Sequence, residues 1–234
     1  MRKKMKLLAI LSEVIMLSVL YSCSNNKENS GKDDEIYKIG INQIVQHSAL
    51  DSAREGFIDG LKEKGYVDGE NIEIDYENAQ GDVSIAQTIS KQFVNNEVDM
   101  IFAISTSSAQ SAYNATKEIP IVFTAVTDPV AAGIANSFES SGNNVTGMSD
   151  MVSMTEQIAL LQEIVPSIRN IGVIYNTSEA NSIVQVDELK AAAKESNLEV
   201  KEISITTVNE INQNLSANIK DIDALYVPTD NTVA

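Results

Sequence analysis

Short apolar segments alternate with longer amphipathic segments along most of the chain. In the first part, apolar runs predict β-strands at residues 37–44, 71–76, 98–104, 119–125 and 144–148. Residues 48–64 and 83–95 have helical periodicity, residues 109–117 are expected to form a helix or a loop, and residues 130–138 a short helix. Near-continuous apolar strands separated by helices are typical of a parallel sheet covered on both faces.

The segment 48–64 is the clearest of these amphipathic helices. Its apolar residues recur at helical spacing, so we expect Leu50, Phe57, Ile58 and Leu61 to face the core. Gly65 follows directly and suits the left-handed residue that ends a helix.

The strand and helix pattern starts again after Asp150. A capping box at residues 153–156 opens a helix that ends before Pro166. Strands are then predicted at 170–175, 198–203 and 224–227, and helices at 182–196 and 208–219. We therefore expect an α/β fold with two Rossmann-like, doubly wound parallel-sheet lobes, at residues 36–149 and 150–234.

The N-terminal residues have the pattern of a targeting segment. Four basic residues precede an apolar stretch at 7–20 that is short for a membrane span and ends just before Cys23, the only cysteine. This resembles a bacterial lipoprotein signal: residues 1–22 form the signal peptide, lipidated Cys23 anchors the exported chain at the outer face of the cytoplasmic membrane, and 23–35 form a polar tether. The alternative is an ordinary cleaved signal with an incidental cysteine.

Composition and motifs narrow the functional classes. The formal net charge is -16, which argues against nucleic acid as a partner because phosphate binding needs a basic patch. A single histidine, His47, disfavours a zinc site, and we expect no metal and no cofactor. The sequence has no nucleophile elbow, phosphate loop or dinucleotide fingerprint, so we expect no enzymatic activity.

Five segments carry a resemblance to a known family: residues 40–66, 98–133, 143–153, 170–182 and 224–234. Their most specific parts are TDPVAAG at 127–133, IYNTSEANS at 174–182 and PTDN at 228–231. Together they resemble the substrate-binding lipoproteins of ABC importers, of the tryptophan/tyrosine-binding type.

The resemblance implies a periplasmic-binding-protein fold of type I. Such a monomer closes on a small molecule, here an aromatic or hydrophobic amino acid, and delivers it to a permease with its ATPase subunit. Family members continue past residue 234, and the second lobe has fewer predicted strands than the first. We therefore expect the C-terminal lobe to be incomplete in this chain.

A zwitterionic ligand needs donors for its carboxylate and an anion for its ammonium group. Ser105, Thr106, Ser107 and Ser108 follow a strand and could bind the carboxylate at a helix N-terminus, or could simply cap that helix. Asp128 follows the next strand and is the first-lobe candidate for the ammonium, with capping before Pro129 as the alternative.

Other polar residues at strand ends complete the expected ligand site. They are Gln43 and Thr127 in the first lobe, and Asn176, Glu179, Asn181, Ser182, Asp230 and Asn231 in the second. His47 either lines the cleft or has a capping or surface role. Two other functions remain open: a sensor or regulator domain of the same fold, and an exported hydrolase that uses His47 and Ser48.

Overall fold

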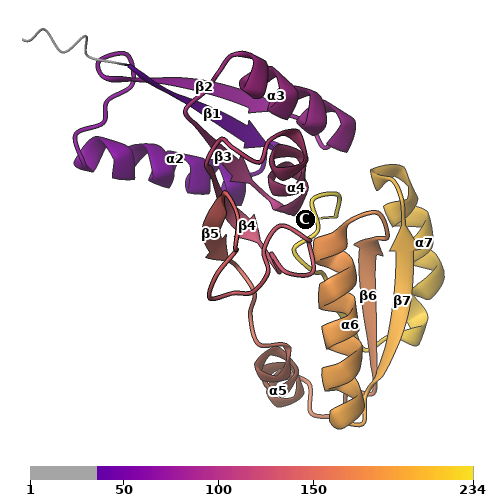
Figure 1. Ribbon diagram of the computed structural model, residues 1–234. Coiled ribbons are helices and arrows are strands. Elements are labelled where there is room, and N and C mark those ends of the chain that lie inside the picture. Colours follow the sequence, from indigo (N-terminus) through magenta and orange to yellow (C-terminus); the bar gives the residue numbers. More distant parts are fainter. Residues whose placement is uncertain (1–35, 234) are drawn as a thin grey trace, which may run out of the picture. The chain divides into compact units, whose positions relative to one another are not determined.

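The computed structural model describes residues 36–233 (Figure 1). The predicted signal peptide, Cys23 and the whole predicted tether lie outside these residues. Within the described residues, no helix is both long enough and apolar enough to cross a membrane. Two parallel sheets form the framework, one with five strands and one with three.

The first sheet and its helices form the N-terminal lobe. Its strands are β1 (Tyr37–Gln43), β2 (Ile72–Asn78), β3 (Met100–Ile104), β4 (Ile121–Val126) and β5 (Val145–Ser149), in the order β2-β1-β3-β4-β5. Its helices are α2 (Ser48–Glu63), α3 (Val83–Asn95) and α4 (Thr106–Ala115). The predicted strands lie within two residues of the observed ends, so apolar runs identified them well.

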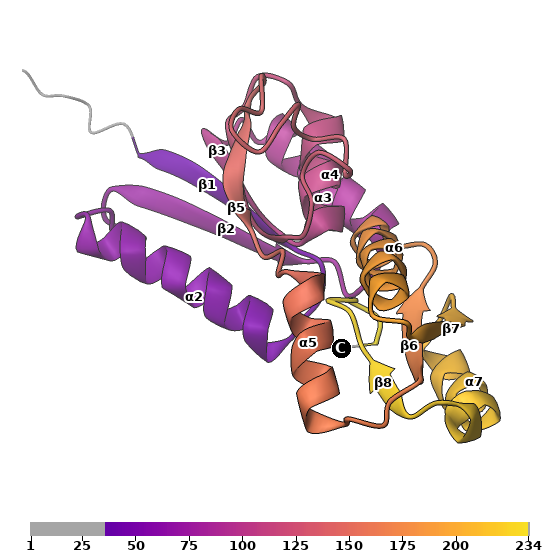
Figure 2. The same ribbon diagram turned by 90° about the horizontal axis from the view of Figure 1, so that it is seen from below.

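Helices cover both faces of this sheet. Figure 2 shows α2 on the side of the strands opposite α3 and α4. Successive residues of β3 alternate between the two cores: Ile101 and Ala103 belong to the cluster that contains α3 and α4, whereas Phe102 and Ile104 belong to the cluster that α2 covers. The expectation of a parallel sheet covered on both faces is confirmed.

Helix α2 packs as its periodicity predicted. Leu50, Phe57, Ile58 and Leu61 all lie against the buried cluster of β1, β2 and β3. The Phe57 and Phe102 rings stack with centroids 3.9 Å apart. Gly65 follows the helix with φ of 88°, in the left-handed region that ends helices.

Two predictions about the middle of the chain were wrong. Residues 130–138 form turns rather than a helix, because the amides of Ile134 and Ala135 both donate to the Pro129 carbonyl and Gly133, with φ of 71°, closes a single turn. Helix α4 begins at Thr106 rather than at residue 109. The hydroxyl cluster is therefore the N-cap and first turn of α4.

The C-terminal lobe contains the second sheet. Its strands are β6 (Asn170–Asn176), β7 (Glu199–Ile205) and β8 (Ala224–Tyr226), in the order β7-β6-β8. Its α-helices are α5 (Met154–Ile164), α6 (Ala180–Glu195) and α7 (Ile211–Asn218). Short 3-10 turns flank α7, and α6 begins two residues earlier than predicted, so Asn181 and Ser182 lie in its first turn instead of in a loop.

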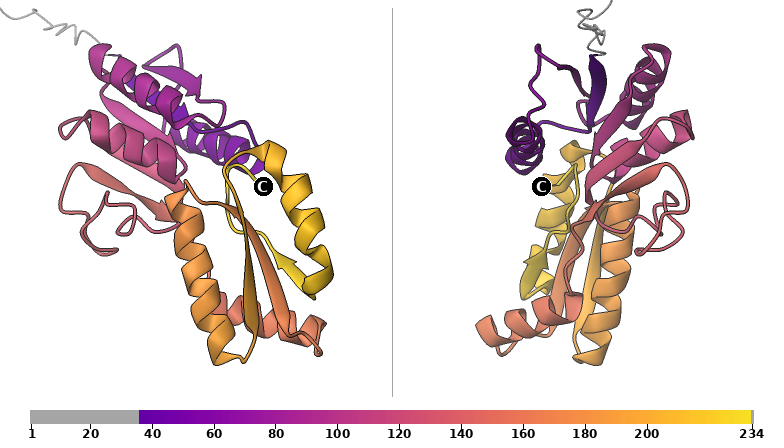
Figure 3. Two further views of the ribbon diagram at one scale, coloured as in Figure 1. Left: turned by 90° about the vertical axis from the view of Figure 1, so that its right-hand side faces the viewer. Right: turned by 60° about the vertical axis from the view of Figure 1, so that its left-hand side comes forward.

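The second lobe also has a layer of helices on each face. Figure 3 shows α6 and α7 on opposite sides of β6 and β7. Val173 and Tyr175 belong to the cluster with α5 and α6, and Ile174 belongs to the cluster with α7. The sheet therefore separates two cores, as in the first lobe.

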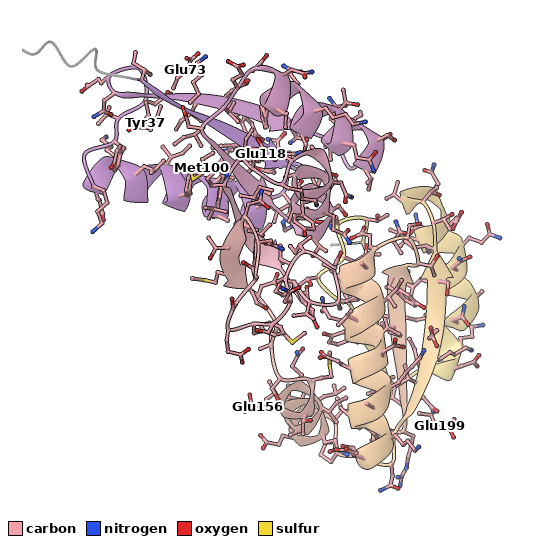
Figure 4. All side chains as sticks on the ribbon, viewed as in Figure 1. Tyr37, Glu73, Met100, Glu118, Glu156 and Glu199 are labelled. Carbon is pink, nitrogen blue, oxygen red and sulfur yellow. The ribbon has the colours of Figure 1, made fainter. Side chains whose placement is uncertain are left out.

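Both sheets change direction at the same place in their topology. The chain runs from β1 out to β2 and then crosses to β3 on the other side of β1, and β6, β7 and β8 repeat this order. Ligands bind outside the carboxyl ends of the strands at such switch points. In Figure 4 the labelled Tyr37, Met100 and Glu199 mark the amino ends of β1, β3 and β7, so the loops of interest lie at the opposite ends.

Candidate functional site

A cavity of about 230 Å³ lies where the loops of both switch points meet. Its N-terminal wall follows β1, β3 and β4, its C-terminal wall follows β6 and β8, and the segment after β5 lies between them. The residues that line it are Val45, Gln46, His47, Ala49, Leu50, Thr106, Ala125, Asp150, Asn181, Thr229, Asp230 and Asn231.

Gln43 holds the first wall in place. The side chain is fully buried, and its Nε2 donates to the Val45 carbonyl at 2.8 Å and to Asp51 Oδ1 at 2.9 Å. Its Oε1 accepts from the Arg54 guanidinium at 3.1 Å. The structure thus engages the Gln43 amide in bracing the loop, and the described cavity lining does not include this predicted ligand residue.

His47 combines the two roles that the sequence left open. It is the N-cap of α2, where its Nδ1 accepts from the Ala49 amide at 3.3 Å, and it also lines the cavity. A neutral imidazole that accepts at Nδ1 carries its proton on Nε2. The remaining ring nitrogen of His47 is therefore a donor.

The N-terminus of α4 presents unused donors to the cavity. Ser105 caps the helix by accepting from the Ser108 amide, and Ser108 Oγ donates to Asn42 Oδ1, so both hydroxyls are engaged internally. The amides of Thr106 and Ser107 belong to the first turn, which has no intrahelical acceptor. These amides and the helix dipole favour an anion at this point.

Ser105 also has an unusual backbone conformation, with φ of 100°. Residues with a side chain rarely adopt positive φ, and such strain gathers at ligand-binding sites. Ser105 is buried immediately before the cavity-lining Thr106. The unusual backbone conformation thus occurs directly before the helix residue that lines the cavity.

Asp230 is the centre of the opposite wall and is 1 % exposed. Its Oδ2 accepts from the Asn176 amide and from Ser182 Oγ, both at 2.7 Å. Its Oδ1 accepts from the Thr232 and Val233 amides. Four donors therefore already satisfy this carboxylate.

Glu179 is saturated in the same way. Its carboxylate accepts from the Asn231 amide at 2.9 Å, from Asn231 Nδ2 at 2.6 Å, from Thr232 Oγ1 at 2.9 Å and from Asn181 Nδ2 at 3.2 Å. The predicted second-lobe residues are thus brought together, chiefly by bonds to one another. Of this set, Asn181, Asp230 and Asn231 line the cavity.

Two buried polar atoms with no partner belong to residues on opposite walls of this cavity. Among the described residues, three buried side-chain oxygens lack a hydrogen bond, namely Thr106 Oγ1, Asn144 Oδ1 and Asn181 Oδ1. Thr106 and Asn181 both line the cavity. Because a buried polar atom without a partner costs about 1–3 kcal/mol, the pair indicates a place for a polar ligand.

Direct hydrogen bonds join the lobes beside the cavity. Thr127 Oγ1 lies 3.2 Å from Thr229 Oγ1, and Gln185 Nε2 donates to both hydroxyls. The Thr229 amide donates to Gln185 Oε1 at 3.1 Å. Thr127, a predicted ligand residue, is therefore part of the contact between the lobes, and Gln185 is a residue that the sequence pattern did not identify.

Asp128 lies away from the cavity lining. Its Oδ1 accepts from the Val130 and Ala131 amides at 2.8 and 2.9 Å, which is the capping role. Asp128 also influences α6: burial and then the Asp128 charge raise the pKa of Glu188. The structure thus supports capping for Asp128 and gives it no position among the described lining residues.

Asp150 lines the cavity and was not predicted. It comes directly after β5, so its position at a strand end was the available signal. Partial burial removes water from its carboxyl group and raises the pKa of that group, and a hydrogen bond with Thr127 opposes this shift. The residue as a whole nevertheless keeps exposed surface.

Known proteins are similar to this chain in sequence and fold. Residues 38–234 match the family described as ABC transporter substrate binding protein. The chain is 49% identical over 241 residues to the tyrosine-binding protein of Clostridioides difficile (strain R20291), an alignment that covers 100% of this chain and 70% of that protein.

Solved structures agree with this relationship. The ABC domain from Streptococcus pneumoniae in complex with L-Trp is 39% identical, with a TM-score of 0.82 over 85% of this chain and 67% of that one. A Vibrio cholerae O1 biovar El Tor conserved domain protein is 41% identical, with a TM-score of 0.80 over 82% of this chain and 65% of that one. The chain thus spans about two thirds of the length of these solved chains.

A ligand-free, open substrate-binding protein from Clostridium difficile gives a useful contrast. It is 53% identical, yet its TM-score is only 0.62, over 84% of this chain and 66% of that one. The backbone arrangement of this chain is therefore nearer that of the tryptophan complex. The predicted resemblance and the type I α/β fold are confirmed, and the chain belongs to the ABC transporter substrate-binding protein family.

Proposed function

We propose that this chain captures an amino acid in the cavity between its lobes, as the solute-binding component of an ABC importer. The single observation that carries the proposal is the pair of buried, unpartnered atoms, Thr106 Oγ1 and Asn181 Oδ1, on opposite walls of one cavity. Relatives named for tyrosine and solved with L-Trp support an aromatic amino acid. A ligand that contacts both walls stabilises the closed arrangement.

The ligand carboxylate would lie at the N-terminus of α4. The amides of Thr106 and Ser107 and the Thr106 hydroxyl are the donors there. A hydrogen bond to a charged group contributes about 1.5–3 kcal/mol, more than a neutral one. This assignment keeps the predicted role for the hydroxyl cluster but limits it to the cavity-lining Thr106 and the adjacent Ser107 amide.

The ligand side chain would lie against the apolar part of the first wall. Val45, Ala49, Leu50 and Ala125 supply this surface. The cavity volume of about 230 Å³ is below the roughly 300–1,000 Å³ typical of sites for drug-sized ligands. A single amino acid therefore suits the space better than a peptide or an oligosaccharide.

Export and anchoring complete the proposal. The basic and apolar N-terminal residues support a signal peptide, and Cys23 supports a lipid anchor on the outer face of the cytoplasmic membrane. There the monomeric chain would deliver its ligand to a permease driven by an ATPase subunit, with binding and no catalysis. Intact mass of the mature protein tests the anchor, since a Cys23 without a diacylglyceryl adduct would refute it.

Thermal unfolding of the chain with a panel of amino acids tests the ligand. At a concentration near 100 Kd, a ligand stabilises the folded state by about 2.7 kcal/mol, or roughly 5–10 °C for a chain of this size. We expect L-tyrosine and L-tryptophan to raise the melting temperature and L-aspartate to leave it unchanged. Absence of stabilisation by every aromatic and aliphatic amino acid would end the ligand assignment.

A further inference from the structure

We propose that Asp150 binds the ligand's ammonium group and that a bound ligand keeps the Asp150 carboxylate ionised. This inference rests on the proposed amino-acid ligand and adds the residue that recognises its amino group. Asp150 is fixed where the two lobes join, because its amide donates to the Val126 carbonyl at 3.2 Å. Asp150 is partly buried there but keeps exposed surface.

Asp150 lies between two cavities. It lines the main cavity with Thr106, and it also lines a smaller cavity of about 130 Å³ between the lobes. An amino acid bound through its carboxylate at the N-terminus of α4 would therefore have Asp150 on another side of the same space. The positive helix end and the negative side chain match the two charges of a zwitterion.

Three other carboxylates considered for the main cavity are already engaged. Asp230 and Glu179 each accept four hydrogen bonds from neighbouring protein groups. Asp128 accepts two amides and is absent from the described lining residues. Of the two carboxylates that line the main cavity, Asp150 and Asp230, Asp150 has more capacity left to accept from a ligand.

The surroundings of Asp150 lack a cation that would stabilise its charge. The titratable groups that share its cavities are His47 and Asp230 in the larger one and Glu188 and Tyr226 in the smaller one. Among the described residues that line either cavity, none is a lysine or an arginine. A ligand ammonium group would supply the missing positive charge.

The direction of the pH dependence follows from this setting. Partial burial raises the pKa of Asp150, so its neutral form persists to higher pH than in a free aspartate. An ammonium group binds the ionised form and lowers the pKa. Ligand affinity should therefore fall as pH drops through the raised pKa, and binding in that range should release protons.

Two probes that differ only in the amino group test the assignment. We would measure binding of L-tyrosine and of 3-(4-hydroxyphenyl)propanoate to the 234-residue chain and its D150N variant by isothermal titration calorimetry. We expect D150N to weaken L-tyrosine binding about tenfold or more and to leave the probe without an amine unchanged or tighter. D128N, which makes the same change in charge outside the cavity lining, should bind L-tyrosine like the unmodified chain.

Proton release gives an independent readout. Titrations at mildly acidic pH in two buffers of different ionisation enthalpy should show proton release by the unmodified chain and none by D150N. Thermal unfolding without ligand checks that the variant folds. D150N should melt no lower than the unmodified chain, because partial burial disfavours the ionised carboxylate of Asp150.

Two other results would contradict either the role of Asp150 or the proposed function. If D150N binds L-tyrosine as tightly as the unmodified chain, or weakens both probes equally, Asp150 does not recognise the ammonium group. If the unmodified chain binds neither probe nor any other amino acid, the proposed function fails, and this inference fails with it.

Discussion

The two walls of the cavity are built on different principles. The N-terminal wall is largely apolar and presents donors that the protein does not use, chiefly at the start of α4 around Thr106. The C-terminal wall is polar, and bonds within the lobe hold both its lining carboxylate, Asp230, and Glu179, which bonds to the lining residue Asn231. The first wall is thus open to a ligand, while the second is organised before any ligand arrives.

Because of this difference, ligand affinity and protein stability should depend on different residues. A change at Thr106 removes a group that has no protein partner, whereas a change at Asp230 removes one with four. We therefore expect the first wall to control ligand binding and the second to control folding of the C-terminal lobe. Variants on the two walls can break this comparison directly.

The largest effect is expected for D230N. The amide places its own hydrogens where the Asp230 carboxylate accepts from Asn176, Ser182, Thr232 and Val233. Since each bond to a charged group is worth about 1.5–3 kcal/mol, we expect a loss of roughly 3 kcal/mol or more in the free energy of unfolding. Urea denaturation measures this loss.

D187N is the matched control for D230N, because exposed Asp187 on α6 makes one ion pair, with Lys190 at 3.6 Å. A change of no more than about 0.5 kcal/mol is expected there. Equal stability of D230N and D187N would show that the second wall is not pre-organised by Asp230.

T106V should have the opposite profile. Valine keeps the shape of threonine but removes Thr106 Oγ1, the buried hydroxyl oxygen with no protein partner. Stability without ligand should stay the same or rise, because a desolvated polar group is removed. Affinity for L-tyrosine should fall roughly tenfold through loss of a bond to the ligand carboxylate.

T88V controls for the chemistry of this substitution, since Thr88 lies at an exposed position on α3 and its Oγ1 donates to the Ser84 carbonyl. It should leave calorimetric affinity unchanged. If T106V binds L-tyrosine with unchanged affinity, the start of α4 is not part of the ligand site.

Q185M tests the contact that joins the walls. Methionine removes the bonds from Gln185 Nε2 to Thr127 and Thr229 and the acceptor of the Thr229 amide. If these bonds form only when the lobes are together, affinity for L-tyrosine should fall about fivefold, which corresponds to roughly 1 kcal/mol. The affinity of a Q185E variant, which keeps the acceptor, should lie between the two, and a Q185M variant that binds normally would make the contact irrelevant to closure.

The sequence predicted the framework more completely than the site. The inward face of α2 follows from the spacing of Leu50, Phe57, Ile58 and Leu61, because burial of a helix face depends on local periodicity. The helix predicted at residues 130–138 was wrong. A proline start and apolar residues favour a helix, but Gly133 and the hydrogen bonds to the Pro129 carbonyl close a turn instead.

Sequence placed the right loops at the strand ends but did not reveal which polar groups were already used. Gln43 ends β1 and Thr106 comes two residues after β3. Every polar group of the Gln43 side chain is bonded within the protein, yet Thr106 Oγ1 has no partner. Asp128 and Asp150 differ in the same way. That distinction depends on contacts between residues far apart in sequence, such as Gln185 with Thr127 and Thr229.

The smallest predicted effect contrasts two carboxylates with opposite pKa shifts. Hydrogen bonds from Lys190 and Tyr175 lower the pKa of partly exposed Glu202, so its stabilising contribution is present above the unfolded pKa and is lost as pH falls through the folded one. Partial burial raises the pKa of Asp150, so its contribution to the free energy of unfolding is lost as pH rises from the unfolded pKa to the folded one.

Comparison of E202Q and D150N with the unmodified chain by urea denaturation between about pH 3 and pH 7 tests these signs. E202Q should lose less than about 1 kcal/mol near neutral pH, since solvent screens a surface pair, and should converge with the unmodified chain in acid. D150N should equal the unmodified chain in acid and match or exceed its stability near neutral pH. The same pH trend in both variants would mean that Asp150 has a cationic partner and no vacancy for a ligand ammonium group.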